Sequence, residues 1–310
     1  MSFFRYLSVI IFLLILGASL PNYGDAQATD HTHEDLSIPR SSLGDLVLAL
    51  KPDKDPDKML EEKTALRAYL SERLDTPVRV IIPLSTAVIT EGLTNGSIDL
   101  AYLSATGAIK ALDLGVADIL LAGEIDGNPY YLSYWVALND KPYKSVEDLR
   151  GQPIAFASKT STSGFLIPFW DIHKKGLLAK GDPPEAFFGN SNVYYGVGYV
   201  SAIERVLAGE AVAAAVSYYV LDKDKHLTKA QRARLKKVVS QGPVPTHTLA
   251  VRHSFPAKER ARLKASLLAL NQENPQLRDK IFTSKLIEVD AETHLQSARE
   301  ALKIIDAITQ

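Results

Sequence analysis

The fold of this chain is decided by three short β-type runs, Leu46-Val-Leu-Ala-Leu50, Val78-Arg-Val-Ile-Ile82 and Ile98-Asp-Leu-Ala-Tyr-Leu103. Amphipathic stretches at 56–74 and 86–95 separate these runs. Strands that alternate with helices indicate a parallel sheet covered by helices, because each parallel crossover needs a connection of helical length. The sequence therefore predicts an α/β fold.

The alternation breaks twice farther along the chain. Asn139-Asp-Lys-Pro-Tyr-Lys144 is a polar, proline-bearing connector, and Gly242-Pro-Val-Pro245 interrupts the pattern again. We interpret these segments as two hinge crossings between two lobes, each a mainly parallel sheet flanked by helices. The predicted organisation is a signal peptide at 1–28, a flexible tail at 29–44, lobe 1 at 45–139 plus 245–310, and lobe 2 at 140–244.

The N-terminus has the pattern of a secretory signal peptide. Arg5 precedes an apolar run at 6–20, and Ala26-Gln-Ala28 offers a small-x-small cleavage site. The chain has no cysteine, which excludes disulfides, thiol nucleophiles and a lipid-modified cysteine anchor. We expect a freely diffusing, monomeric periplasmic protein. His31-Thr-His33-Glu-Asp35 resembles a weak metal-binding sequence but is interpreted as disordered polar sequence, and neither a metal nor a cofactor is expected.

The charge balance limits the class of partner. The formal net charge is −1 and the pI is near 6.7, so the chain lacks the basic excess that binds nucleic acid. The sequence also lacks a G-x-S-x-G nucleophile elbow and an H-E-x-x-H metal motif, so we do not expect an enzyme. A small molecule is the expected ligand.

Two hydroxyl-rich loops are the candidate ligand site. Ser158-Lys-Thr-Ser-Thr-Ser-Gly164 joins a predicted strand to an apolar helical stretch, and Ser104-Ala-Thr-Gly107 does the same in lobe 1. Each loop alone is explained as a helix N-cap. Free N–H groups and the positive end of the helix dipole also make such a junction an anion receptor. Two of them, one in each lobe at the carboxyl end of a strand, favour a binding site.

The chain resembles a known family, the periplasmic phosphate/phosphite/phosphonate-type substrate-binding proteins of ABC importers. The resemblance covers roughly 45–285 and implies the two-lobed type II periplasmic-binding fold. It depends on four segments, which are Asn95-Gly-Ser-Ile-Asp-Leu-Ala-Tyr-Leu-Ser104, Lys144-Ser-Val-Glu-Asp-Leu-Arg-Gly151, Thr160-Ser-Thr-Ser-Gly164 with Pro168, and the run from Ala202 to Val216.

The resemblance implies that oxyanion contacts come from both loops. By position these contacts are Ser104, Thr106, Thr160, Ser161, Thr162 and Ser163, all of them hydrogen-bond donors. Ser85 and Thr86 occupy a further cleft position, and are equally well explained as N-cap residues.

The chain departs from the family pattern at two places. It has Tyr199-Val200 where related sequences have His-Asp, and Val212 where they have Asp. Tyr199 can donate one hydrogen bond in place of the histidine, whereas valine cannot accept one from a protonated P–OH or an amino group. We therefore do not expect aminoethylphosphonate or singly protonated phosphate as the ligand.

Tyrosines and two lysines keep the ligand class open. The tyrosines gather near these positions, and most are expected in the core or the sheets, since strands favour aromatic residues. A minority in the cleft would make it less polar and could surround a quaternary ammonium group. Lys51 and Lys159 are possible sources of positive charge.

The leading hypothesis is an exported solute-binding protein that closes on a small oxyanion, or on an organic molecule that bears one, and delivers it to an inner-membrane ABC permease. The alternative is a ligand-sensing subunit of the same fold that presents its ligand to a histidine kinase ectodomain. The sequence does not separate these two roles.

Overall fold

The structure is a computed structural model that describes residues 44–51, 56–223, 226–282 and 284–309. The predicted signal peptide, nearly all of the predicted tail and the segment His31 to Asp35 lie outside these residues. Within the described ranges, no helix combines the length and the hydropathy needed to span a bilayer.

The three apolar runs that decide the fold are neighbouring strands of the first sheet. β1 (Leu46–Ala49) lies between β2 (Val78–Ile81) and β3 (Leu100–Leu103), and both pairings are parallel. The six-stranded sheet has the order β11-β4-β10-β3-β1-β2. Its antiparallel members are β10 (Thr248–Arg252), which pairs with both β3 and β4 (Ala117–Glu124), and β11 (Lys285–Ile287), which pairs with β4.

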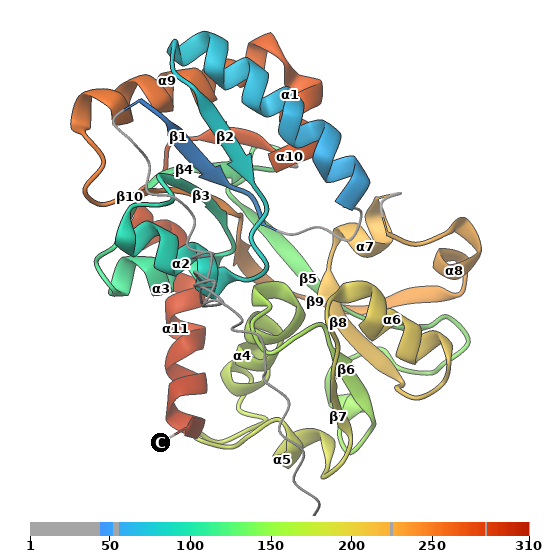
Figure 1. Cartoon of the computed structure of the whole chain (residues 1–310). Coiled ribbons are helices and arrows are strands. Elements are labelled where there is room, and N and C mark those ends of the chain that lie inside the picture. Colours follow the sequence, from blue (N-terminus) through green and yellow to red (C-terminus); the bar gives the residue numbers. More distant parts are fainter. Residues whose placement is uncertain (1–43, 52–55, 224–225, 283, 310) are drawn as a thin grey trace, which may run out of the picture. The chain divides into compact units, whose positions relative to one another are not determined.

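Helices cover both faces of the first sheet, as Figure 1 shows. α1 (Pro56–Leu74), α9 (Ala257–Glu273) and α10 (Pro275–Phe282) pack on one face, where Leu48 meets Leu66 and Leu267 in one apolar core. α2 (Thr86–Asn95) and α3 (Ala105–Asp113) pack on the other. Successive side chains of β1 point to opposite faces of the sheet and pack into two different cores, as expected for a sheet buried on both sides.

The second sheet is built from a continuous part of the chain. Its order is β7-β6-β8-β5-β9, with β5 at Tyr130–Leu138, β6 at Ile154–Phe156, β7 at Val193–Tyr195, β8 at Ala213–Ser217 and β9 at Leu235–Pro245. The helical segments here are a 3-10 turn at Glu147–Leu149, a π-helix at Thr162–Leu166, α4 (Ile167–Lys174), α5 (Glu185–Phe188), α6 (Tyr199–Leu207), α7 (Tyr219–Asp222) and α8 (Lys229–Ala233).

The chain passes between the sheets earlier than the sequence predicted. β5 pairs with β8 and β9, so the first passage falls at 125–129 instead of at the polar connector 139–144. The second falls at 246–247, next to the predicted crossing. The connector is a turn before the 3-10 helix, where the Asp148 carboxylate accepts from the N–H groups of Lys144 and Ser145. Periodicity identifies β5 as a strand, but does not reveal which sheet it joins.

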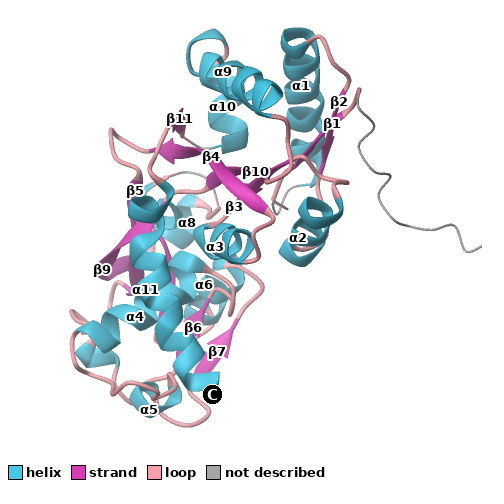
Figure 2. Cartoon of the chain, turned by 90° about the vertical axis from the view of Figure 1, so that its left-hand side faces the viewer, coloured by secondary structure: helices cyan, strands magenta, loops and turns pink. Residues whose placement is uncertain are grey.

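The C-terminal helix α11 (Ala291–Thr309) packs with both lobes, although the sequence assigned it to lobe 1. Leu295, Ala298 and Ala301 belong to the core that contains α2 and α3. Ile304 and Ile308 pack against the core of the second sheet. Figure 2 shows α11 running beside α4 and below α3. The final helix thus contacts elements of both sheets.

A buried histidine of α11 should make stability depend on pH. The Nε2 atom of His294 lies 3.1 Å from the Thr246 carbonyl oxygen, and burial lowers the pKa of His294 below its usual 6.5. The unfolded chain therefore binds a proton more readily, and the stabilisation present above pH 6.5 is lost as the pH falls below it. Urea unfolding at pH 8 and pH 5 should show a smaller loss for His294→Gln than for the unaltered protein. Equal losses would contradict this role.

Candidate ligand-binding site

The two predicted receptor loops touch each other. Ser104 is the N-cap of α3 and accepts a hydrogen bond from the Gly107 N–H at 3.4 Å. The next residue but one, Thr106, places its Oγ1 atom 2.8 Å from the Oγ1 atom of Thr162, and its N–H donates to the same oxygen at 3.4 Å. The start of α3 in lobe 1 and the start of the π-helix in lobe 2 therefore meet through threonine hydroxyls.

Tyrosines complete the polar contacts around the second loop. Ser163 is fully buried, and its Oγ atom lies 2.7 Å from the Tyr199 hydroxyl. The Tyr131 hydroxyl donates to the same Oγ atom at 3.3 Å. Burial raises the pKa of Tyr131 well above its usual value, so this phenol stays protonated and can donate. We call Thr106, Tyr131, Thr162, Ser163 and Tyr199 the hydroxyl cluster.

A row of polar side chains in the second sheet supports this loop. The Ser133 hydroxyl donates to the Ser163 carbonyl oxygen at 2.5 Å and accepts from the Gln241 amide at 2.9 Å. Ser133 lies opposite Ser217 on β8 and opposite Gln241 on β9. We did not predict Ser133 as a supporting residue. A signal was available, because it interrupts the apolar run of β5 with a residue that must find a partner when buried.

The remaining predicted residues lie outside the hydroxyl cluster. Ser161 caps the π-helix and accepts from the Gly164 N–H at 3.0 Å. Ser85 caps α2, with the Val88 N–H donating to it at 3.3 Å, and Thr86 is exposed beside it. Thr160 is exposed, and its hydroxyl lies 3.4 Å from that of Ser158. For Ser85 and Ser161 the structure thus shows the capping role that a helix start needs.

Val212 does not occupy a cleft position. It precedes β8, and its N–H donates to the Pro153 carbonyl oxygen at the amino end of the parallel pair β6 and β8. The hydroxyl cluster adjoins the carboxyl ends of these strands, about 16 Å away at the rise of a β-strand. The interpretation of Val212 as a lost ligand contact is therefore wrong, and the argument against amino-bearing ligands loses that support. Tyr199, in contrast, does contact the second loop.

A cavity of about 640 Å³ lies next to the hydroxyl cluster. Its walls come from the segment after β1, from α1, β3, β5 and α7, and from α10. Tyr131 belongs both to these walls and to the cluster. We call this space the tyrosine cavity after its ring-bearing side chains, which are Tyr102, Tyr131, Tyr218, Tyr219, His226 and His247.

Four of these rings, those of Tyr131, Tyr218, Tyr219 and His226, form a continuous row. The centroid of Tyr131 lies 5.9 Å from that of Tyr218, which lies 6.0 Å from that of Tyr219. Tyr219 in turn is 5.6 Å from Tyr199 and 5.2 Å from His226. Neighbouring aromatic rings at these separations attract each other through edge and face contacts. The row links the hydroxyl cluster to the cavity.

Charged side chains stand at the rim of the tyrosine cavity. Three are basic and three are acidic, namely Lys51, Lys223, Lys280, Glu61, Glu62 and Asp279. Lys159 lies elsewhere, with its ammonium group 5.1 Å from the centre of the Tyr195 ring. The described part of the rim therefore carries no net formal charge from its lysines and carboxylates.

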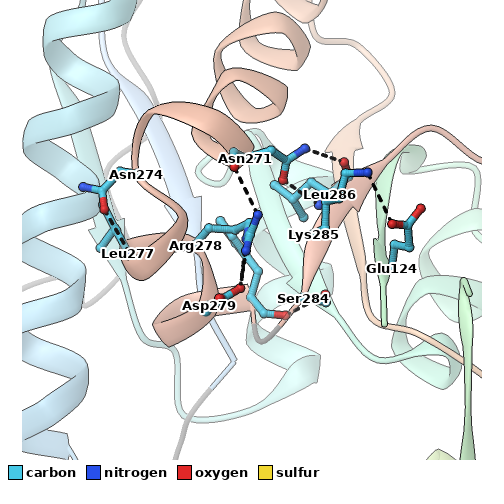
Figure 3. Close-up of polar contacts among 10 residues, drawn as sticks. Glu124, Asn271, Asn274, Leu277, Arg278, Asp279, Ser284, Lys285 and Leu286 are labelled. Carbon is cyan, nitrogen blue, oxygen red and sulfur yellow. Dashed lines mark hydrogen bonds and ion pairs between the residues drawn. The ribbon is translucent and has the colours of Figure 1, made fainter. Parts of the chain in front are cut away.

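The wall that contains Asp279 and Ser284 is held to the first sheet by the polar network in Figure 3. Arg278 pairs with Asp279 at 2.7 Å and donates to the Asn271 carbonyl oxygen at 3.2 Å. The Asn271 side chain bonds both the N–H and the carbonyl of Leu286, at 2.9 and 2.8 Å, as a strand partner would. This network fixes the end of α10 against β11.

The geometry suits binding by hydrogen bonds and aromatic contacts. No group of three metal-ligating His, Asp or Glu side chains occurs within the described ranges. Hydroxyl groups and helix N-termini donate to oxyanions, whereas tyrosine rings contact apolar or cationic groups.

The chain is similar to known binding proteins. The family model for the phosphonate periplasmic substrate-binding protein of ABC transporters matches residues 48–294. The phosphate-import protein PhnD of Mycolicibacterium smegmatis is 26% identical over 212 residues, which are 67% of this chain and 61% of that relative's length.

Solved structures show the same fold at low identity. PhnD1 from Prochlorococcus marinus in complex with methylphosphonate has a TM-score of 0.71 and 18% identity, covering 86% of this chain and 99% of its own. XAC2383 from Xanthomonas citri bound to ATP has a TM-score of 0.71 and 21% identity, with the same coverage of both chains. These likenesses establish the type II periplasmic-binding fold that the sequence predicted.

Proposed function

Because the chain belongs to the periplasmic substrate-binding proteins of phosphonate ABC transporters, we propose that it binds a phosphorus oxyanion or a phosphonate-like oxyanion for import. One observation carries the proposal, namely the direct contact of Thr106 with Thr162, which joins the two receptor loops. The similar proteins point the same way, since one is named for phosphate import and another holds methylphosphonate.

The oxyanion would bind where the two helices begin. The first N–H groups of a helix have no acceptor within it, and the helix dipole adds partial positive charge there. Thr106 and Thr162 would exchange their mutual hydrogen bond for bonds to ligand oxygens. Ser163 and Tyr199 supply further hydroxyls within reach of the same loop. Charge-assisted bonds of this kind are stronger than the neutral bonds that they replace.

Contacts from both lobes would couple binding to closure. Thr106 belongs to the first lobe and Thr162 to the second, so a ligand that bonds to both stabilises the arrangement in which the lobes are close. The passages at 125–129 and 246–247 are the segments that would bend. We propose that the closed form is delivered to an inner-membrane ABC permease, after export through the signal peptide at 1–28.

Thr162 provides the test of this site. Thr162→Val removes the hydroxyl while keeping the shape of the side chain, and should weaken binding by about 1–3 kcal/mol per lost hydrogen bond. Thr160→Val is the matched control, because Thr160 is exposed and lies outside the hydroxyl cluster.

Calorimetric titration with phosphate, phosphite and methylphosphonate measures both variants, using whichever anion raises the melting temperature most. Equal affinities of Thr162→Val and the unaltered protein would refute the site, whereas no binding of any of these anions would refute the proposed ligand class.

A further inference from the structure

We propose that the natural ligand joins its acid group to a bulky, mainly apolar organic group, of phenyl size or larger, which occupies the tyrosine cavity. This inference rests on the proposed function, since the acid group is assigned to the hydroxyl cluster. The organic group is assigned to the row of rings from Tyr131 to Tyr219.

The size of the cavity is the first argument. Its volume of about 640 Å³ lies within the usual range for sites that bind organic molecules. A water molecule in the liquid takes up about 30 Å³, and a tetrahedral oxyanion with five heavy atoms takes up only a few times that volume. Inorganic phosphate or methylphosphonate would leave most of the space to water. A larger ligand would displace that water from apolar surface, which is favourable.

The lining of the cavity is the second argument. Tyr102 is buried, and its hydroxyl donates to the Phe282 carbonyl oxygen at 2.8 Å, so its ring is held in place. Met59 and Ile281 are buried apolar members of the same walls. In the described lining the cationic side chains are Lys51, Lys223 and Lys280, and all three are exposed. An apolar interior with exposed, balanced charges does not suit a ligand with several phosphates.

The position of Tyr131 is the third argument. Its hydroxyl donates to Ser163 in the hydroxyl cluster, and its ring neighbours Tyr218 in the cavity. A ligand that bonds to the cluster through its acid group therefore has an aromatic surface directly beside it. A phenyl ring attached to the phosphorus atom would lie within reach of Tyr131 and Tyr218, where aromatic pairs are favourable.

The test compares methylphosphonate with phenylphosphonate, which differ only in the organic group. Titration calorimetry on the unaltered full-length protein should show phenylphosphonate binding at least tenfold more tightly, because apolar area is buried along the ring row. This comparison does not depend on the folding of any variant. Tyr218→Ala should then reduce the phenyl-to-methyl affinity ratio at least fivefold.

Tyr143→Ala is the matched control for the ring. Tyr143 is half-buried and donates to Gln152 at 3.4 Å, outside the tyrosine cavity, so its variant should keep the ratio of the unaltered protein. Equal affinities for the two phosphonates would overturn this inference and leave the proposed function standing. Binding of neither phosphonate would overturn this inference, and the proposed function would fall with it only if phosphate and phosphite also failed to bind. Binding of tetramethylammonium without any phosphonate would replace the acid-bearing ligand with a cation held by the rings.

Discussion

Replacement of Asp99 by alanine should lower the free energy of unfolding by about 3–5 kcal/mol, the cost of breaking a buried ion pair by removing one partner. Asp99 is fully buried just before β3. Its carboxylate accepts from the Val47 N–H at 2.9 Å and from Arg252 Nε at 2.7 Å. Alanine would leave a buried N–H group without its acceptor and a guanidinium group, 19% exposed, without its counterion.

Asp113→Ala is the matched control for Asp99→Ala. Asp113 pairs with Arg299 at 2.6 Å, but its side chain is 57% exposed. An exposed pair contributes only about 0–1 kcal/mol, so the same substitution there should change stability by no more than this. Urea unfolding of both variants measures the difference. Equal shifts of the midpoint would show that burial of the Asp99 pair is not what makes it important.

Gly164→Ala is expected to disrupt the second receptor loop. A β-carbon at this position would lie 2.8 Å from Ser161 Oγ and 3.1 Å from a ring carbon of Tyr199, and closer still to the side chain of Ala157. Ala157 cannot move away by rotation, because its side chain is a single methyl group on a backbone bonded to the Gly164 carbonyl. Overpacking of this kind costs about 1–3 kcal/mol, and displacement of Ser163 should also lower oxyanion affinity.

Gly107→Ala is the corresponding change in the first loop. The added β-carbon would meet Thr86 Cγ2 at 3.1 Å, and Thr86 is exposed and free to change rotamer. We therefore expect a small effect on the melting temperature and on anion affinity. If Gly107→Ala proved as damaging as Gly164→Ala, close packing of the second loop would not explain the requirement for glycine.

The sequence predicted the architecture because its signals were local. The apolar runs at 46–50, 78–82 and 98–103 became neighbouring strands, and the residues after the third run became an N-cap and a helix start. Strand propensity, capping residues and apolar spacing depend on neighbours in the chain, so they can be read without the structure.

The rest depended on partners distant in sequence. Nothing local distinguishes a β5 that joins the second sheet from one that joins the first, or an α11 that contacts one lobe from one that contacts both. Val212 stands where the family pattern has an aspartate, and the resemblance implied that this aspartate is a ligand contact. Asp99, which also stands just before a strand, has a structural role instead, because it accepts from the Val47 N–H and pairs with Arg252. At the same place before β8, valine packs with the apolar core of the second sheet.

The candidate site was predicted in part. The two loops, Thr162 and Tyr199 were found by motif and resemblance, and the structure brings Thr106, Thr162, Ser163 and Tyr199 together. The composition of the cavity was not predicted, because tyrosines scattered along the sequence give no indication of which ones face a common space. Only the tertiary arrangement selects Tyr102, Tyr131, Tyr218 and Tyr219.

The place of β10 in the first sheet sets an order for folding. β10 lies between β3 and β4 in the sheet. Leu100 of β3 therefore pairs with Val251, a residue about half a chain length farther along the sequence. The strands of the second sheet all lie within residues 130–245, between β4 and β10 in the chain, so this sheet can form before the first sheet is complete. Contacts between residues so distant in sequence slow folding, because closing the long loop between them lowers the entropy of the chain before the contact stabilises it. The first sheet therefore cannot pair β3 on both of its edges until residues 248–252 have been synthesised.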